Sequence, residues 1–366
     1  MATSYSNMGI CQGNLFGPGF CRQWLDNGSD SPHHPQLMQL LGVDAQSNPS
    51  WLLFAGGGIA LYIAARSAAD ALGGGQPMRA ARLAIGNWMP IVVVAVAAVL
   101  VNQPAAAIGV VFATSVASLT LGIGTISIMA GSASSAAEPP SVGMKSSWPM
   151  ILPTALLVFL AGFRGQLTAL HAIVLAIQGI VVFTVCREAR SSASLPASKY
   201  RPLRTIQFIL AVALAGIGAW CALHAMEQAS HSSEAASPAL LAATFLSPLL
   251  LLPLLGSGID LAQRGSADVT TDACVGLMLL NLCVLLPMLI AVSYASGHLK
   301  FLTPVGRLQL PLVVWRVDVV ALIVLGLFLL PVGLGRWKLS RMQGLGLLGG
   351  YAAYLGLSLL LGTTPI

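Results

Sequence analysis

Apolar stretches long enough to cross a lipid bilayer follow one another from Trp51 to the end of the chain. Only 8% of the residues are charged, whereas 56% are hydrophobic. The hydrocarbon core of a bilayer is about 30 Å thick, so a helix needs roughly 20 apolar residues to cross it. Continuous apolar runs such as Ile91–Leu100 and Ala321–Val332 favour helices, because the strands of a membrane barrel alternate in polarity. The sequence therefore predicts an all-α polytopic membrane protein without a separate soluble domain.

About ten transmembrane helices are predicted, and an even number places both termini on one side of the membrane. Their approximate ranges are 51–72, 83–102, 105–131, 148–163, 167–186, 205–226, 239–262, 270–294, 317–334 and 342–361. Alternate connections divide the Lys and Arg residues into 13 on one face and 5 on the other. Because connections rich in Lys and Arg stay in the cytoplasm, the sequence predicts a multi-pass protein of the inner (cytoplasmic) membrane with both termini outside.

Four regions differ in composition. They are a polar N-terminal segment at 1–50, a first five-helix membrane repeat at 51–187, a basic, Ser-rich cytoplasmic linker at 188–204, and a second five-helix repeat at 205–366. In the N-terminal segment, the His33–His34 pair is interpreted as part of a loop, and Cys11 and Cys21 are either bridged or free. The net charge of +6 is spread between apolar stretches and indicates no nucleic-acid partner.

The two halves share a short pattern at equivalent junctions. Residues Gly165–Ala172 read GQLTALHA, and residues Trp337–Gly344 read WKLSRMQG, so each has Leu-Thr or Leu-Ser before a long apolar run. With five helices per half, the second copy enters the membrane from the opposite side. Two inverted repeats are the architecture of many secondary transporters, whose substrate site lies where the repeats meet.

The second half also carries a set of motifs between Ser237 and Pro287. Pro253 lies in an apolar run, a polar turn follows at Gln263–Asp268 (QRGSAD), and the segment Asp272–Asn281 reads DACVGLMLLN. This arrangement resembles the second alpha repeat of the calcium/cation antiporter superfamily, the sodium/calcium exchangers. In that family, a Gly-Thr-Ser-x-Pro-Glu helix break precedes a basic-Gly-x-Ala-Asp turn and a Gly-Asn-x-x-Gly-Ser-Asn-x-x-Asn segment.

The first half is similar to the same family in a more altered form. The segment Asn102–Gly109 resembles the family's turn into its third helix, and the run Leu339–Gly344, with two tyrosines after it, resembles the family's last helix. Thr114, Ser115 and Ser118 occupy the positions of the family's Ser, Asn and Asn. The two tyrosines of the last helix are Tyr351 and Tyr354. The resemblance spans about residues 51–362, and it implies an inverted-repeat fold and cation transport.

The glutamates of the family are missing. Exchangers hold calcium between two glutamates, one from each repeat, because a divalent ion that leaves water needs anionic oxygen ligands. The resemblance places the second glutamate at Leu254 and the first within Pro90–Val99, where the helix break is also deleted. Neither position offers a carboxylate. The sequence therefore predicts no metal site and argues against calcium exchange by the family's usual mechanism.

The candidate ion-binding residues are polar or helix-breaking groups in the core. They are Thr114, Ser115, Ser118, Pro253, Ser257, Asp272 and Asn281. Hydroxyl and amide groups can coordinate a monovalent ion, and Pro253 is expected to kink or break the seventh helix and so free a carbonyl oxygen. The alternative is that these groups only join helices through hydrogen bonds and small-residue packing.

Two acidic residues, Asp260 and Asp272, flank the polar turn of the second half, and Asp268 is its last residue. Asp260, Asp268 and Asp272 are expected to be interfacial, where they are solvated or paired with Arg264. The alternative is a displaced cation or proton site. These carboxylates are the nearest substitutes for the missing glutamates, so their burial decides between the two interpretations.

Other ionisable residues receive a structural interpretation. Asp318 and Arg316 are expected to anchor the start of the ninth helix at the membrane boundary, and residues two apart do not face each other on a helix. His171 and His224 lie near helix ends and are expected to be ordinary interfacial or packed histidines.

Two functions remain open. The first is an integral membrane transporter that resembles sodium/calcium exchangers and moves a cation or other small solute through a hydrated crevice between the third and eighth helices. The alternative is a non-transporting membrane scaffold in which apolar side chains fill that crevice. The expected partners are the lipid bilayer and a monovalent cation or proton, with no cofactor. An enzyme is not expected, because Ser257 has no evident base and the chain has no HExxH motif.

Overall fold

The computed structural model describes residues 50–73, 80–133, 145–188, 202–232, 238–295, 308–310, 312–337 and 339–362. Residues Ser50–Ile366 form one compact unit. The predictions for residues 1–49, including Cys11, Cys21 and the His33–His34 pair, lie outside the described residues, as do those for most of the linker at 188–204.

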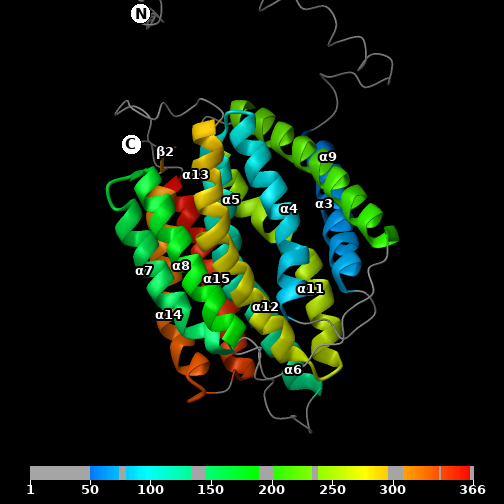
Figure 1. The fold of residues 1–366 in the computed structure, drawn as a ribbon, viewed down its shortest axis with the longest axis vertical. Coiled ribbons are helices and arrows are strands. Elements are labelled where there is room, and N and C mark those ends of the chain that lie inside the picture. The colour runs from blue at the N-terminus through cyan, green and yellow to red at the C-terminus, as the bar shows by residue number, and fades with distance from the viewer. Residues whose placement is uncertain are drawn as a thin grey trace, which may run out of the picture. The chain divides into compact units, whose positions relative to one another are not determined.

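Ten apolar helical segments make up the described residues of this unit (Figure 1). They are α3 (Ser50–Gly73), α4 (Ala80–Leu100), α5–η1–α6 (Pro104–Ala117, Ser118–Gly122, Ile123–Ala133), η2–α7 (Lys145–Met150, Ile151–Gly162), α8 (Ala169–Glu188), α9 (Pro202–Ser232), α10–η3–α11 (Pro238–Leu241, Ala242–Leu246, Ser247–Gln263), α12–η4–α13 (Ala267–Leu280, Asn281–Leu285, Leu286–Ala295), α14 (Leu312–Gly333) and α15 (Arg341–Gly362). Eight segments are long and apolar enough to cross a membrane, and Ser147–Gly162 and Ala169–Thr184 are shorter apolar helices. The prediction of an all-α polytopic membrane protein with about ten transmembrane helices is confirmed.

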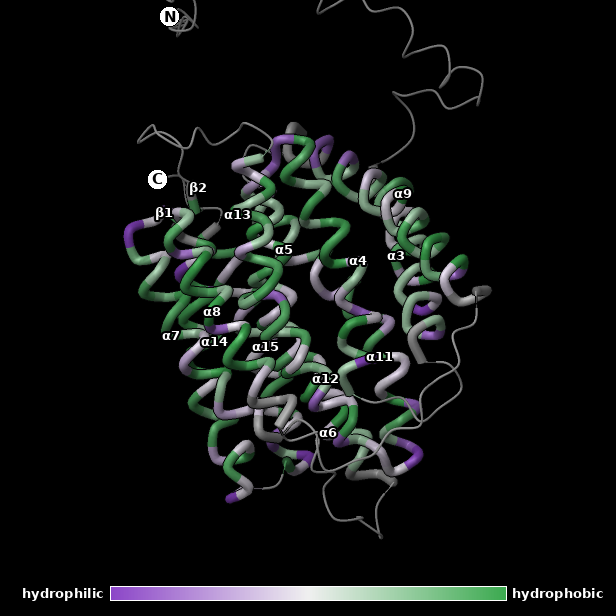
Figure 2. Tube along the Cα trace, viewed as in Figure 1, coloured by the Kyte–Doolittle hydropathy of each residue, from purple (hydrophilic) through white to green (hydrophobic). Residues whose placement is uncertain are grey.

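Large apolar side chains lie on the outside of the helices. Leu160, Ile177, Leu210, Ile217 and Leu360 are each more than half exposed. Hydrophobic residues run along the helices, and hydrophilic residues gather toward the helix ends (Figure 2). Soluble proteins rarely expose large continuous apolar patches. The described surface is therefore suited to contact with lipid.

A short two-stranded ribbon shows that two of the connections lie on the same side. Strand β1 (Gln166–Leu167) follows α7 and pairs antiparallel with β2 (Leu308–Gln309), which precedes α14. Gln166 lies opposite Gln309, and the amide of Leu310 donates to the carbonyl of Gly165 at 3.0 Å. The predicted topology places both connections on one face of the membrane, in agreement with this pairing.

Positive backbone φ angles occur at matching places in the two halves. The turn between the second and third spans has Asn102 at φ 63°, and the turn between the seventh and eighth has Gly265 at φ 81°. After the fourth and ninth spans, Gly165 and Gly335 both have φ 72°. Residues other than Gly and Asn seldom adopt this conformation. The two halves therefore share the geometry of two turns.

The Leu-Thr and Leu-Ser pattern caps a helix in both halves. The amide of Thr168 donates to Nδ1 of His171 at 3.1 Å, and the amide of Ser340 donates to Oε1 of Gln343 at 2.8 Å. The amide of Gln343 also donates to Oγ of Ser340 at 3.3 Å. These are capping-box contacts that satisfy amides at the helix start. His171 thus has a structural role, as expected.

The third and eighth spans each contain one π-helical turn. These turns are η1 (Ser118–Gly122) and η4 (Asn281–Leu285). A third π-helical turn, η3 (Ala242–Leu246), lies in the seventh span. Single π-helical turns inside α-helices often occur at functional sites. Together with the turns and caps, they identify the two inverted repeats.

The first helices of the two repeats pack against each other through glycines. Helices α3 and α9 lie side by side (Figure 1). A Cβ atom on Gly218 would lie 2.8 Å from the carbonyl oxygen of Gly57, and a Cβ on Gly57 would lie 2.8 Å from that of Gly218. Small residues allow close helix approach in membranes, so this contact depends on both glycines.

One helix start differs from the sequence prediction in a way that matters for function. The ninth span was expected to begin at residue 317, but α14 begins at Leu312, directly after Pro311. Asp318 is therefore inside the helix and only 1% exposed, whereas Arg316 is exposed. The expectation that Asp318 anchors the helix start is wrong, because the helix begins six residues earlier and buries this side chain.

Candidate functional site

A polar cluster joins the third and eighth spans in the core. Nδ2 of Asn281 donates to Oγ1 of Thr114 at 2.9 Å and to Oγ of Ser115 at 3.3 Å. All three side chains are fully buried. The third span belongs to the first repeat and the eighth to the second, so the cluster lies where inverted-repeat transporters place their substrate site. The structure brings these three predicted residues together.

The hydroxyl groups of the cluster are also bonded within their own helix. Oγ1 of Thr114 donates to the carbonyl of Val110 at 2.5 Å, and Oγ of Ser115 donates to that of Val111 at 2.7 Å. The hydroxyl of Ser118 donates to the carbonyl of Ser115 at 2.9 Å. Such bonds satisfy buried hydroxyl protons and leave the oxygen lone pairs for another donor or an ion.

Asn281 retains one unused acceptor. Among the described residues, its Oδ1 has no hydrogen-bond partner, although the side chain is 0% exposed. A buried polar atom without a partner costs about 1–3 kcal/mol. A hydrogen-bond donor or a cation that binds to this oxygen would therefore remove a free-energy cost that the cluster now carries.

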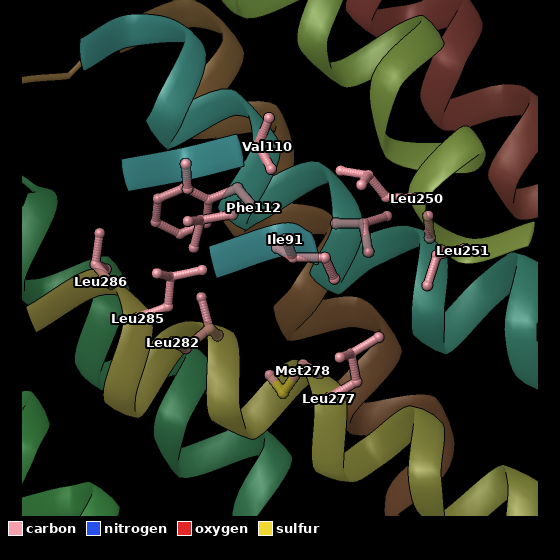
Figure 3. Close-up of a cluster of buried hydrophobic side chains, with 14 of the residues drawn as sticks. Ile91, Val110, Phe112, Leu250, Leu251, Leu277, Met278, Leu282, Leu285 and Leu286 are labelled. Atoms are coloured by element: carbon pink, nitrogen blue, oxygen red, sulfur yellow. The ribbon is translucent and has the colours of Figure 1, made fainter. Parts of the chain in front are cut away.

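Buried apolar side chains occupy the positions that the resemblance assigns to the missing glutamates. Leu254 is 0% exposed, as are Ile91, Val94 and Ala95 of the first repeat. Figure 3 shows the apolar side chains of α4, α5, α11 and the α12–η4–α13 span gathered between these helices; they include Ile91, Val110, Phe112, Leu250, Leu251, Leu277, Met278, Leu282, Leu285 and Leu286. Within the described ranges, no group of three or more His, Cys, Asp or Glu side chains could hold a metal ion.

Pro253 and Ser257 lie within a continuous helix. α11 is helical from Ser247 to Gln263, so the break expected at Pro253 is not found. The π-helical turn of this span comes earlier, at Ala242–Leu246, just before Pro248. Oγ of Ser257 donates to the carbonyl of Pro253 at 2.9 Å. This bond uses the Ser257 hydroxyl inside its own helix, and a role for either residue in ion binding stays a prediction.

Asp272 is buried and faces a tryptophan from the other repeat. The side chain is 2% exposed, and its Oδ1 accepts a hydrogen bond of 2.8 Å from Nε1 of Trp148 in η2. The expectation of an interfacial Asp272 is wrong, whereas the expected pairing of Asp260 with Arg264 is confirmed at 2.9 Å. Nine residues separate Asp272 from Asn281, about 13 Å along a helix, so Asp272 does not belong to the polar cluster.

The Trp148–Asp272 hydrogen bond gives a prediction about stability. Trp148→Phe is expected to lower the free energy of unfolding by about 1–2 kcal/mol, because it removes the donor to a buried carboxylate. Denaturation in mixed detergent micelles would measure it. Trp88→Phe is the matched control, since Nε1 of Trp88 has no partner within the described part of the chain. Equal losses in both variants would show that packing alone accounts for the effect.

Asp318 and Tyr354 form a buried pair that the sequence did not predict. Oη of Tyr354 donates to Oδ1 of Asp318 at 2.7 Å, and the two side chains are 5% and 1% exposed. Tyr351 stacks on Tyr354 with ring centroids 6.0 Å apart. The resemblance had placed both tyrosines in the last helix, but it gave no carboxylate to pair with them.

His224 lies away from these groups. It is partly exposed, its Nε2 lies 3.1 Å from Nε2 of Gln228, and its ring stacks on Trp220 with centroids 5.7 Å apart. An exposed Trp–His stack near a helix end is suited to the membrane interface. The expectation of an ordinary interfacial histidine fits this position.

Comparisons with known proteins agree with this architecture. The H+/Ca2+ exchanger CAX shares 12% identity over 90% of this chain and 89% of its own length, with a TM-score of 0.70. Native YfkE shares 15% identity over 84% and 90%, with a TM-score of 0.60. The sodium-calcium exchanger NCX_Mj shares 16% identity over 84% and 97%, with a TM-score of 0.56. At such identities these likenesses concern the fold. No curated protein matches the sequence.

Two inverted repeats whose third and eighth spans meet at a buried polar cluster define the fold of an exchanger-like membrane transporter. The family model described as "Sodium/calcium exchanger protein" matches residues 204–360. This match covers less than half of the chain, and together with the shared fold it agrees with the resemblance that the sequence motifs indicated.

Proposed function

We propose that this protein transports a monovalent cation or a proton, and that it does not exchange calcium by binding it between two glutamates. The observation that carries the proposal is the buried Oδ1 of Asn281, which has no partner among the described residues and lies beside hydroxyls of the other repeat. Neutral oxygens of this kind suit an ion of single charge. Ca²⁺ takes six to eight oxygen ligands, several of them carboxylates.

Electrostatics supports the same choice. A divalent ion that enters the membrane core loses a large hydration energy, and buried acidic side chains normally compensate for it. The glutamate position of the second repeat is the buried Leu254, and Asp272 lies about 13 Å along its helix from Asn281. We further propose an inner-membrane location with both termini outside, from the distribution of Lys and Arg.

A second candidate function is a membrane scaffold that kept the exchanger fold. The observation that favours it is a cluster of buried apolar side chains, among them Leu277, Leu282 and Leu285, gathered between helices of the two repeats (Figure 3). A transporter with this apolar packing needs a second conformation in which water reaches the polar cluster. A scaffold does not need one.

Ion flux in proteoliposomes tests the proposal. Purified full-length protein would be assayed for Na⁺, K⁺, Ca²⁺ and proton movement, with Asn281→Leu as the test variant. We expect flux of at least one monovalent cation or of protons, and a loss of about tenfold or more in Asn281→Leu, since one hydrogen bond to a charged group contributes about 1.5–3 kcal/mol.

Asn87→Leu is the matched control for this experiment. Asn87 is also a buried asparagine, 1% exposed, and its Oδ1 likewise has no hydrogen-bond partner among the described residues, but its Nδ2 donates to the carbonyl of Leu83 within α4 at 2.8 Å and not to the other repeat. Its flux is expected to stay near that of the wild type. Flat traces for all four ions would favour the scaffold, and saturable calcium exchange in the wild type would refute the proposal.

A further inference from the structure

Asp318 is a buried acidic residue of the ninth span, and it does not belong to the polar cluster around Asn281. It lies six residues after the start of α14, about 9 Å along the helix. Its side chain is 1% exposed, and Oδ1 accepts the hydrogen bond of 2.7 Å from Tyr354. In the described part of the chain, Oδ2 has no hydrogen-bond partner. Ionisable side chains at such positions are rare and commonly functional.

The charges around Asp318 determine whether its side chain is more stable as a carboxylate or as a neutral carboxylic acid. An isolated carboxylate in an apolar environment is very costly, and one hydroxyl donor offsets only part of the cost. Among the described elements, those that pack most extensively on α14 are α5, α7, η2 and α15. α5 and α7 contain no ionisable side chain. Helices α5 and α7 therefore place no positively charged side chain beside Asp318.

The remaining ionisable groups near α14 are accounted for individually. Tyr354 and Tyr351 of α15 are neutral hydroxyl groups, and Tyr351 lies next to Ser247 of α11. Arg341 begins α15, thirteen residues before Tyr354. Lys145 is in η2, which packs near Gly333 at the far end of α14. Arg316 on α14 itself is exposed. The packed state therefore suits a neutral carboxyl group.

A proton fits this position better than a metal ion. A bare alkali cation requires several oxygen ligands in place of its hydration shell. Asp318 and Tyr354 supply two carboxyl oxygens and one hydroxyl. One proton on Oδ2 neutralises the acid without any further ligand and leaves Oδ1 free to accept from Tyr354. The geometry therefore accommodates the gain or loss of one proton at Asp318 without any further ligand.

We propose that Asp318 is a proton-binding site, with Tyr354 as its positioning residue, and that it is distinct from the Asn281 cluster. In binding, carboxylate and hydronium give a carboxylic acid and water, and release reverses this step. α14 contacts α5, and α15 contacts η1, so both helices of the site touch the span that carries Thr114, Ser115 and Ser118. The inference rests on the proposed transport function and names the proton as the ion that Asp318 binds.

Infrared spectroscopy of the full-length protein in membranes tests the site without measuring transport. The acid-minus-alkaline difference spectrum is expected to contain a protonated-carboxyl band that is lost in Asp318→Asn. The band is expected to shift in Tyr354→Phe, which keeps the acid and removes its donor. It is expected to persist in Asp260→Asn, because Asp260 is exposed and paired with Arg264. Asparagine has the shape of a neutral aspartic acid, so Asp318→Asn should fold.

The outcomes separate this inference from the proposed function. A spectrum of Asp318→Asn identical to that of the wild type would overturn the site, whatever the flux measurements show. If Asp318→Asn did not fold, an unshifted band in Tyr354→Phe would overturn it as well. If Asp318→Asn loses both the proton flux and the infrared carboxyl band, both proposals are supported. A band that belongs to Asp318 combined with flat traces for all ions supports the site and rejects transport.

Discussion

Leu254→Glu is expected to destabilise the protein strongly, although it restores a residue that the exchanger family carries at this place. Leu254 is 0% exposed and packed among apolar side chains. A charged side chain in the middle of a membrane helix costs about 2.5–3.5 kcal/mol on insertion scales. The first repeat has no carboxylate near Ile91–Val99 with which a calcium ion could be shared. Denaturation in mixed micelles, with and without Ca²⁺, would measure the loss.

Leu254→Met is the control for this substitution. Methionine keeps the volume and polarity of the site, so its cost should stay below about 1.5 kcal/mol. Calcium is expected to leave both variants unchanged. A clear stabilisation of Leu254→Glu by calcium would contradict this expectation, because it would mean that further oxygen ligands reach the centre of the bundle.

Gly218→Leu is expected to disrupt the contact between α3 and α9. A Cβ atom at this position would lie 2.8 Å from the carbonyl oxygen of Gly57 and 2.9 Å from Cγ of Leu61. Backbone cannot move away as a flexible side chain can, so the helices must separate. Overpacking of this kind costs typically 1–3 kcal/mol, and a leucine at a backbone contact belongs at the upper end. The unfolding free energy and the yield of folded protein would report it.

The same helix provides the control. No described atom outside the local backbone lies within 4 Å of a Cβ atom placed on Gly216. Gly216→Leu is therefore expected to leave stability near or slightly above that of the wild type, since leucine favours helix more than glycine does. Similar losses for both variants would refute the close glycine contact as the cause.

The bilayer explains why so much of the fold was predictable. Length and apolarity alone identify membrane spans, and the expected ranges agree with the helices to within a few residues at most ends. The Leu-Thr and Leu-Ser junctions indicated the repeat, and the structure gives them a physical meaning as helix caps at Thr168 and Ser340. The polar cluster was predictable because Thr114, Ser115 and Asn281 occupy motif positions.

The two buried carboxylates could not be placed for different reasons. The sequence predicts a helix end at Asp318 because charged residues usually mark the membrane boundary, but the helix begins directly after Pro311, and proline is common at helix starts. Asp272 finds its partner in Trp148, which is 124 residues away in the sequence. No local pattern predicts such a contact. The π-helical turns were also unpredictable, since no composition distinguishes Ala242–Leu246 from an ordinary helical turn.

The β1–β2 ribbon fastens the two repeats to each other at one end of α7 and α14. It ties the loop after α7 in the first repeat to the chain before α14 in the second, through backbone hydrogen bonds such as that from Leu310 to Gly165. Each such bond contributes about 1 kcal/mol, so separating these two loops is costly. If one repeat moves against the other, we expect α7 and α14 to separate less beside the ribbon than at their opposite ends.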